Sequence, residues 1–143
     1  MLSKEAIKAQ NKYKKLGAII SWLVVEPWKP KMWKVKMQRL NFDYAVGLNP
    51  KSKGHKKEKL TLAGMETWKI TTPNSDPEKI LLYFHGGAYQ VGSPKGYYPM
   101  LTHLARETGF TIYIPDYRLA PEHYHPAQVE DGVATYEALI NDL

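Results

Sequence analysis

Two adjacent glycines, Gly86 and Gly87, follow His85 at the point where an apolar run ends. The run belongs to the stretch "LLYFHGGAYQVGS", residues 81–93. Glycine permits backbone angles that other residues rarely adopt, and it lets a bound molecule approach the backbone amides closely. The carboxyl ends of parallel strands are also where α/β proteins bind their ligands. This loop is therefore the first candidate for a site that acts through backbone N–H groups.

Nucleotide binding fits this loop poorly. Gly87 and Gly92 have the G-x-x-x-x-G spacing, but Ser93 stands where the phosphate-binding lysine belongs. A dinucleotide fingerprint fails as well, because residue 88 is alanine and the G-x-G spacing is lost. A plain structural turn would explain the glycines, but it would not explain the histidine before them or the segment that follows.

A second motif, "DYRLAPEHYHPAQVEDGVATY", covers residues 116–136 after the next apolar strand. A buried arginine needs a carboxylate partner, and three acidic residues could serve Arg118. They are Glu122, Glu130 and Asp131. His123 and His125 have no neighbours that complete a metal-ligand set, so no metal site is predicted. The chain has no cysteine, which excludes disulfides and thiolate zinc sites.

Together "YFHGGAYQVGS", "LARETGF" and "DYRLAPEH" resemble the hormone-sensitive lipase family of α/β-hydrolases over about residues 60–143. The resemblance implies an oxyanion hole, in which backbone N–H groups of the loop stabilise the charge that develops on an ester carbonyl. Its residues would be Gly86, Gly87 and Ala88, with the amides of Gly87 and Ala88 as donors. The resemblance also implies a supporting set around this loop, made of His85, Tyr117, Arg118, Glu122 and Asp131. It implies no cofactor and no metal.

Position 88 departs from the family, which usually has glycine there. Alanine keeps the amide, but it reduces the freedom of the loop and the space for an acyl group. The chain holds five serines, and none lies in the G-x-S-x-G sequence of a nucleophile elbow. In the family the elbow and the other triad members follow the helix that carries Asp131. We therefore expect the nucleophile, acid and base to lie beyond Leu143, and this chain alone to be inactive.

The residue pattern after position 60 predicts alternating strands and helices. Strand-like residues occupy 61–71, and an apolar strand is expected at 79–84. A helix follows at 97–108, a strand at 110–115 and a second helix at 127–143. One stripe of the second helix is apolar and consists of Val129, Val133, Tyr136 and Ile140. This order predicts the N-terminal half of an α/β-hydrolase fold, with a mostly parallel sheet and crossover helices.

Three segments are predicted: a helical cap segment at 1–45, a basic loop at 46–60 and the hydrolase part at 61–143. The strand at 79–84 would present an unpaired apolar edge. That edge could pair with a complementing C-terminal half or with a second copy of the chain.

The charge is distributed unevenly, with fifteen Lys/Arg against four Asp/Glu in the first 60 residues. An amphipathic pattern in residues 1–25 makes contact with a membrane surface an alternative role for this part. Nucleic-acid binding is not expected for the lysine-rich residues 49–59, because they are not interleaved with aromatic residues and no recognised binding motif surrounds them. The prediction is part of a cytoplasmic serine carboxylesterase that acts on short or medium acyl esters. The alternatives are a non-catalytic binding module and a membrane-associated protein.

Overall fold

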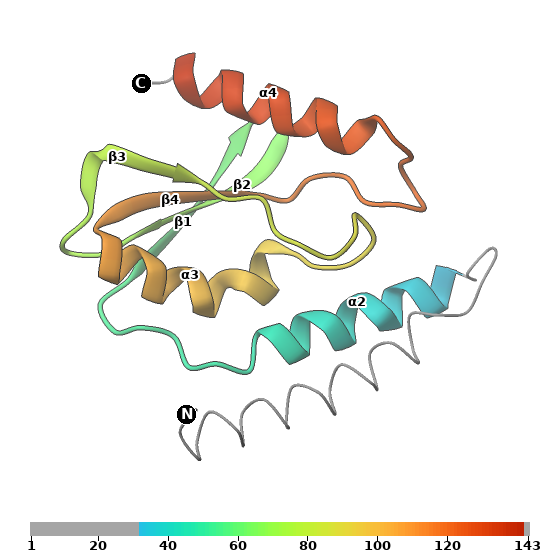
Figure 1. The fold of residues 1–143 in the computed structure, drawn as a ribbon, viewed down its shortest axis with the longest axis horizontal. Coiled ribbons are helices and arrows are strands. Elements are labelled where there is room, and N and C mark those ends of the chain that lie inside the picture. The colour runs from blue at the N-terminus through green and yellow to red at the C-terminus, as the bar shows by residue number, and fades with distance from the viewer. Residues whose placement is uncertain (1–31, 142–143) are drawn as a thin grey trace, which may run out of the picture. The chain divides into compact units, whose positions relative to one another are not determined.

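The computed structural model describes residues 32–141, so the membrane contact predicted for residues 1–25 lies outside the described chain. The elements follow in the order α2 (Met32–Val46), β1 (Lys56–Leu62), β2 (Met65–Thr71), β3 (Asp76–Leu82), α3 (Pro94–Thr108), β4 (Phe110–Pro115) and α4 (Ala127–Asn141) (Figure 1). Residues from Arg39 onward form one compact unit that contains the whole sheet. This unit begins within the predicted cap segment, and β1 takes up the last part of the predicted loop 46–60.

The four described strands form one mixed sheet in the order β1-β2-β4-β3. Only β3 and β4 pair in parallel, with α3 as the crossover between them; β1 pairs antiparallel to β2, and β2 antiparallel to β4. The expectation of a mostly parallel sheet is therefore wrong for these strands. For β1 and β2 the reason is a hairpin turn at Ala63-Gly64, where both residues have positive φ (48° and 79°). A two-residue turn of this kind matches the twist of antiparallel strands.

The lysine-rich strand β1 forms one edge of the sheet, and its lysines cover aromatic rings of β2 and α3. The Nζ of Lys57 lies 4.1 Å from the ring centroid of Trp68, which packs edge-on against Tyr98. Lys59 pairs with Glu66 across the hairpin at 2.9 Å. An ammonium group over the face of an aromatic ring is attracted by the negative face of the ring. Lysines along an edge strand also discourage pairing with another chain.

Helix α3 has strong signals at both ends and packs one apolar face on the sheet. Ser93 caps its N-terminus by accepting a bond from the Gly96 amide, and Gly109 ends it in the left-handed conformation with φ 71°. Its buried face contacts side chains of β2 and β4 in one core cluster, which contains Trp68, Ile70, Tyr98, Leu101, Ala105, Ile112 and Ile114. The predicted strand at 110–115 and the predicted helix at 97–108 are confirmed, with α3 starting slightly earlier.

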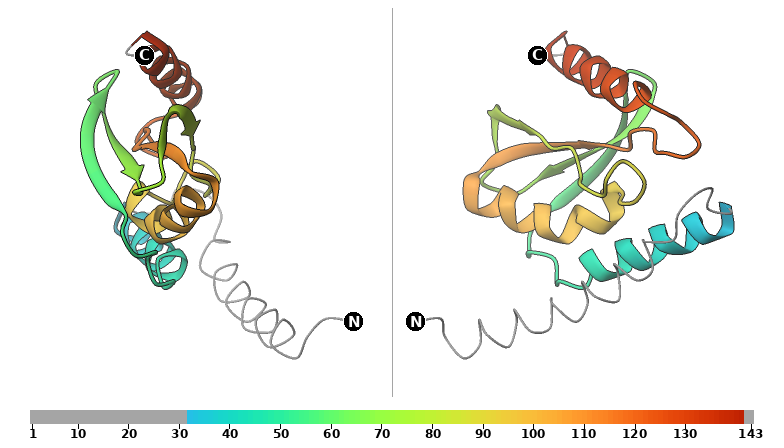
Figure 2. Two further views of the ribbon diagram at one scale, coloured as in Figure 1. Left: turned by 90° about the vertical axis from the view of Figure 1, so that its left-hand side faces the viewer. Right: turned by 45° about the vertical axis from the view of Figure 1, so that its right-hand side comes forward.

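Helix α4 covers the opposite face of the sheet from α3, as the views in Figure 1 and Figure 2 agree. Leu139 packs there in a second cluster with Leu62 and Tyr113, and the partly buried Ile80 and Leu82 of β3 join it. The apolar stripe of α4 lies on the other side of the helix. Its residues are Val129, Val133, Tyr136 and Ile140, each half-exposed.

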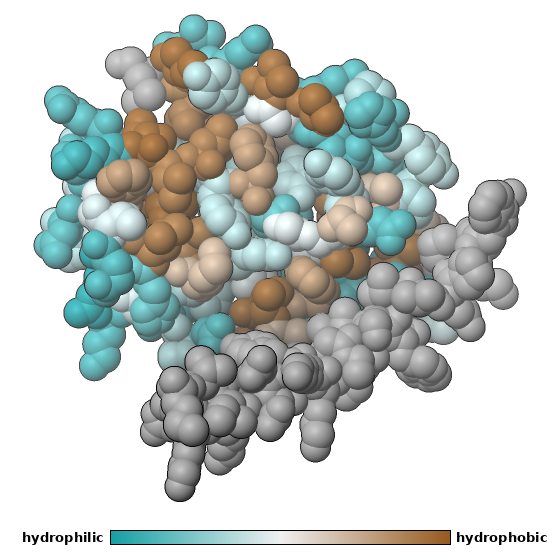
Figure 3. All heavy atoms as spheres, in the orientation of Figure 1, coloured by the Kyte–Doolittle hydropathy of each residue, from teal (hydrophilic) through white to brown (hydrophobic). Residues whose placement is uncertain are grey.

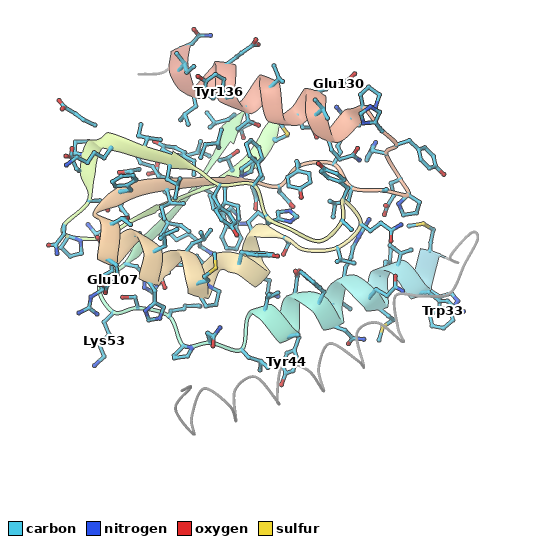
Figure 4. All side chains as sticks on the ribbon, in the orientation of Figure 1. Trp33, Tyr44, Lys53, Glu107, Glu130 and Tyr136 are labelled. Atoms are coloured by element: carbon cyan, nitrogen blue, oxygen red, sulfur yellow. The ribbon has the colours of Figure 1, made fainter. Side chains whose placement is uncertain are left out.

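Apolar side chains gather over α4 and β3 on the face drawn in Figure 3. Tyr136, one residue of the stripe, lies on α4 in Figure 4. In the described sheet, β3 is an edge strand that pairs only with β4. None of the helices in residues 32–141 has the length and apolar character needed to cross a membrane.

Substitutions on the two sides of α4 should separate its packed face from its exposed stripe. We expect Leu139→Ala to lower the free energy of unfolding by about 3 kcal/mol, because it removes a buried side chain from the core. Val133→Gln should change it by less than about 0.5 kcal/mol, because this side chain is half-exposed. Urea unfolding followed by circular dichroism measures both. Equal losses would mean that the stripe is covered in solution, and sedimentation would then show an oligomer.

Candidate functional site

The loop between β3 and α3 turns so tightly that two of its glycines cannot be replaced. Residues 87, 88 and 89 have φ values of 134°, 52° and 59°, and Gly92 has 95°. A Cβ built on Gly87 would lie 1.9 Å from the carbonyl oxygen of Val91, and one on Gly92 would lie 2.5 Å from that of Gly86. The amides of Gln90 and Val91 both donate to the Gly87 carbonyl at 3.0 Å. The loop is therefore closed on itself by its own backbone.

The three predicted oxyanion-hole residues have different surroundings. Within residues 32–141, the N–H groups of Gly87 and Ala88 donate to no protein acceptor. Gly86 instead lies against Tyr97: a Cβ there would be 3.1 Å from the Tyr97 hydroxyl. Burial raises the pKa of Tyr97, and a hydrogen bond from the Gly86 backbone partly offsets this. Two adjacent amides without internal acceptors, at the carboxyl end of a strand, can bind an oxyanion.

His85 is buried beneath this loop between two tyrosine rings. Its ring centroid is 4.3 Å from that of Tyr117 and 5.8 Å from that of Tyr97, and both pairs are stacked. Its Nδ1 lies 3.1 Å from the Gly86 carbonyl, which requires the proton to sit on Nδ1. Burial lowers the pKa of His85 below its ordinary value. The neutral ring thus supports the end of the strand, and its Nε2 is buried without a hydrogen-bond partner in residues 32–141.

Tyr117 connects the loop to the end of β4. Its hydroxyl donates to the backbone carbonyl of His85 at 2.5 Å. Burial raises the pKa of Tyr117 to about 12, so the phenol keeps the proton that this bond needs. Because His85 begins the glycine loop and Tyr117 follows β4, this bond joins the carboxyl ends of the two parallel strands.

Arg118 is held mainly by Asp131 of α4. Its Nε donates to Oδ1 of Asp131 at 2.9 Å, its Nη2 lies 2.7 Å from the same oxygen, and its backbone amide donates to Oδ2 at 2.8 Å. Burial would raise the pKa of Asp131, but these bonds outweigh it and hold the pKa below its ordinary value. Glu130 accepts a weaker bond at 3.3 Å.

Glu122, a candidate partner of Arg118, pairs instead with Arg39, which was not among the predicted site residues. Arg39 of α2 donates from Nη1 and Nη2 to the two carboxylate oxygens of Glu122, at 2.7 and 2.6 Å. The two residues are 83 positions apart, so no local pattern connects them. One signal was present: Arg39 is the only arginine among the basic residues of the first 60 positions. Arginine forms the bidentate pair with a carboxylate that lysine cannot form.

The serines of the described chain have structural partners or are buried. Ser93 donates to Asp43 at 2.6 Å while it caps α3, and Ser75 accepts from the Thr72 amide at 2.9 Å. Ser52 is buried, and His55 contacts its backbone carbonyl, not its hydroxyl. In residues 32–141, no serine hydroxyl is bonded to a histidine that could act as general base.

The same residues hold no group of three His, Cys, Asp or Glu side chains that could bind a metal ion. His123 and His125 are both exposed.

Comparison with known proteins agrees with this geometry. Residues 81–142, which include the glycine loop, β4 and α4, match the alpha/beta hydrolase fold family. A solved esterase from the bacterial hormone-sensitive lipase family is 32% identical, with a TM-score of 0.74 over 90% of this chain. The chain thus has the fold of the α/β-hydrolases, and it is similar to an esterase of the hormone-sensitive lipase family.

Curated relatives of this chain carry esterase and hydrolase names. An acetyl-hydrolase of Streptomyces hygroscopicus is 28% identical over 128 residues, which is 85% of this chain and 40% of the relative. A second relative is LipR of Mycobacterium tuberculosis, which is provisionally named as an acetyl-hydrolase. It is 34% identical over 90 residues, which is 63% of this chain and 29% of the relative. The chain thus spans less than half the length of these relatives, and 42% of the solved esterase.

Substitutions at the two neighbouring positions of the loop should have opposite effects on stability. Gly87→Ala places a Cβ on the Val91 carbonyl, and we expect the free energy of unfolding to fall by at least about 2 kcal/mol. Ala88→Gly relieves a left-handed alanine, and we expect a gain of about 0.5–1 kcal/mol. Thermal or urea unfolding measures both. A tolerated Gly87→Ala, or a loss at Ala88→Gly, would contradict this backbone geometry.

Burial of neutral His85 should make stability depend on pH. Because its folded pKa is lowered, only the unfolded chain binds a proton just below the ordinary pKa of 6.5. The free energy of unfolding should therefore decline as pH falls from 7.5 to about 5. His85→Phe keeps a stacked ring without a titrating group and should flatten this decline. Urea unfolding across this pH range provides the measurement, and an unchanged slope in the variant would assign the decline to other groups.

Proposed function

We propose that this chain contributes the oxyanion-hole side of a serine carboxylesterase active site that takes short or medium acyl esters. The observation that carries the proposal is the pair of adjacent amides, Gly87 and Ala88, which donate to no acceptor in residues 32–141. They lie in a loop at the carboxyl end of β3, and its backbone geometry excludes a Cβ at Gly87. The esterase and acetyl-hydrolase names of the relatives support an ester as the substrate.

In the proposed reaction, the carbonyl oxygen of the ester accepts hydrogen bonds from the Gly87 and Ala88 amides. As a serine attacks the carbonyl carbon, this oxygen becomes negatively charged, and both bonds strengthen. Loss of one such donor typically costs about 10²–10³ in kcat. His85 takes no proton in this scheme, because its ring is buried and burial lowers its pKa. The methyl group of Ala88 narrows the space beside the hole, which favours small acyl groups.

The serine, its general base and the acid are proposed to lie outside these 143 residues. The three serines in the described chain each have a structural role or are buried, which supports this part of the proposal. The apolar surface formed by the free edge of β3 and the stripe of α4 is where the remainder of the hydrolase domain would pack. The opposite edge of the sheet is β1, whose lysines discourage pairing with another strand.

A fusion enzyme tests the proposal. Residues 1–143 are joined to the part of the solved bacterial esterase that this chain does not match, and hydrolysis of p-nitrophenyl acetate, butyrate and decanoate is measured. We expect turnover of the acetate and butyrate esters. Gly87→Ala keeps the amide, but its Cβ would push the backbone off the Val91 carbonyl and displace this amide. The variant should therefore lower kcat by about 10²–10³-fold, as the loss of one donor does. The 143-residue chain alone should show no turnover.

The intact bacterial esterase serves as the control for the assay. Thermal unfolding of the fusion is followed in parallel, so that a folded protein is assayed. A folded fusion without turnover would overturn the role of the loop. Hydrolysis by the 143-residue chain itself would place the nucleophile within it and overturn the division of the active site.

A further inference from the structure

Helix α2 places two charged side chains one turn apart, Arg39 and Asp43, and both reach the glycine loop. Residues four apart lie on the same face of a helix. The Nε of Arg39 donates to the backbone carbonyl of Gln90 at 2.8 Å, and its Nη2 donates to that of Ala120 at 2.9 Å. The same guanidinium forms the bidentate pair with Glu122. One side chain therefore joins the tip of the glycine loop to the loop after β4.

Asp43 holds the other end of the glycine loop, where α3 begins. Its Oδ2 accepts the bond from Ser93, whose hydroxyl caps the first turn of α3. A Cβ built on Gly96 would lie 2.6 Å from Oδ1 of Asp43, so the helix backbone packs directly on this carboxylate. A negative charge at a helix N-terminus is stabilised by the unpaired amides of the first turn.

The three residues before Gln90 have few other contacts to hold their backbone. Residues 87–89 all have positive φ, and Ala88 and Tyr89 adopt this region without being glycine. Backbone in such conformations persists only when its surroundings constrain it. Apart from the two bonds to the Gly87 carbonyl, one further backbone bond constrains the loop: Ala120 donates to the Tyr89 carbonyl at 2.8 Å. Arg39 adds bonds at both ends of this contact: it donates to the carbonyl of Gln90, which follows Tyr89, and to the carbonyl of Ala120.

We propose that Arg39, assisted by Asp43, is a positioning residue that fixes the amides of Gly87 and Ala88. The inference rests on the proposed oxyanion-hole function for its catalytic meaning. We call the bonds of Arg39 to the Gln90 and Ala120 carbonyls the clamp; they hold the backbone of the loop whether or not the loop binds an oxyanion. Arg39 acts through four hydrogen bonds in a planar fork, so its geometry matters as well as its charge.

Amide hydrogen exchange in the 143-residue chain, measured by NMR, tests the clamp without any assay of hydrolysis. In Arg39→Ala, we expect the amides of Gln90, Val91 and Ala120 to exchange at least about tenfold faster. The core amides of Ile70 and Ile112 should stay within about twofold. Arg39→Lys keeps the charge but loses the fork, and it should accelerate exchange at the same three positions. Arg106→Ala, at an exposed site in the last turn of α3, is the matched control.

The fusion enzyme described above supplies a second measurement. There Arg39→Ala should lower kcat while KM changes little, because the amides act mainly in the transition state. Should Arg39→Ala not fold, Arg39→Lys carries the same comparison. Exchange that accelerates equally at loop and core amides, or at neither, would overturn the clamp. If exchange in the 143-residue chain shows the clamp but the folded fusion has no turnover, the clamp stands and only the proposed function is overturned.

Discussion

The carbonyl oxygen of Val91 occupies the space that a side chain at residue 87 would need, 1.9 Å from the ideal Cβ position. That steric constraint makes the chain turn back at the end of β3 with its backbone in contact with itself. The turn uses the Gly87 carbonyl as the acceptor for two amides, and the amides of Gly87 and Ala88 have no acceptor within residues 32–141. The neutral, buried His85 and its two tyrosine neighbours support the base of the turn.

Two arginine–carboxylate pairs stabilise the surroundings of this turn in different ways. Arg118 and Asp131 join the segment after β4 to α4, and the Asp131 carboxylate is buried among these bonds. Leaving such a carboxylate without its partner would be costly, because a buried charge has lost its hydration. Arg39 and Glu122 are more exposed, with side chains 24% and 33% accessible. Exposed ion pairs add little to stability. The second pair therefore acts mainly by holding the Arg39 side chain in place against the Gln90 and Ala120 carbonyls.

The two edges of the sheet differ in chemistry. β1 carries lysines that discourage pairing with other strands, and the ammonium group of Lys57 lies over the rings of Trp68 and Tyr98. β3 ends in apolar residues, α4 carries a half-exposed apolar stripe, and apolar side chains gather over both elements on the face drawn in Figure 3. An apolar surface of this kind marks an interaction site in soluble proteins. The asymmetry agrees with a chain whose relatives are more than twice its length.

Much of this protein could be predicted from its sequence, because the signals are local. The apolar run at 110–115, the periodicity and glycine cap of α3, and the glycines after β3 each depend on residues close in the chain. The motifs around them also sufficed to indicate the family. The strand β1 was missed because lysines on an edge strand resemble a solvated loop.

Other features were decided only by the tertiary structure. The periodicity of α4 showed that Val133 and Tyr136 share a face, but only the packing of Leu139 on the sheet determined which face is buried. The pairing of Arg39 with Glu122, and of Arg118 with Asp131, depended on which segments the fold brings together. Charge alone allows any arginine to pair with any carboxylate, and only the distances in the folded chain select the partner.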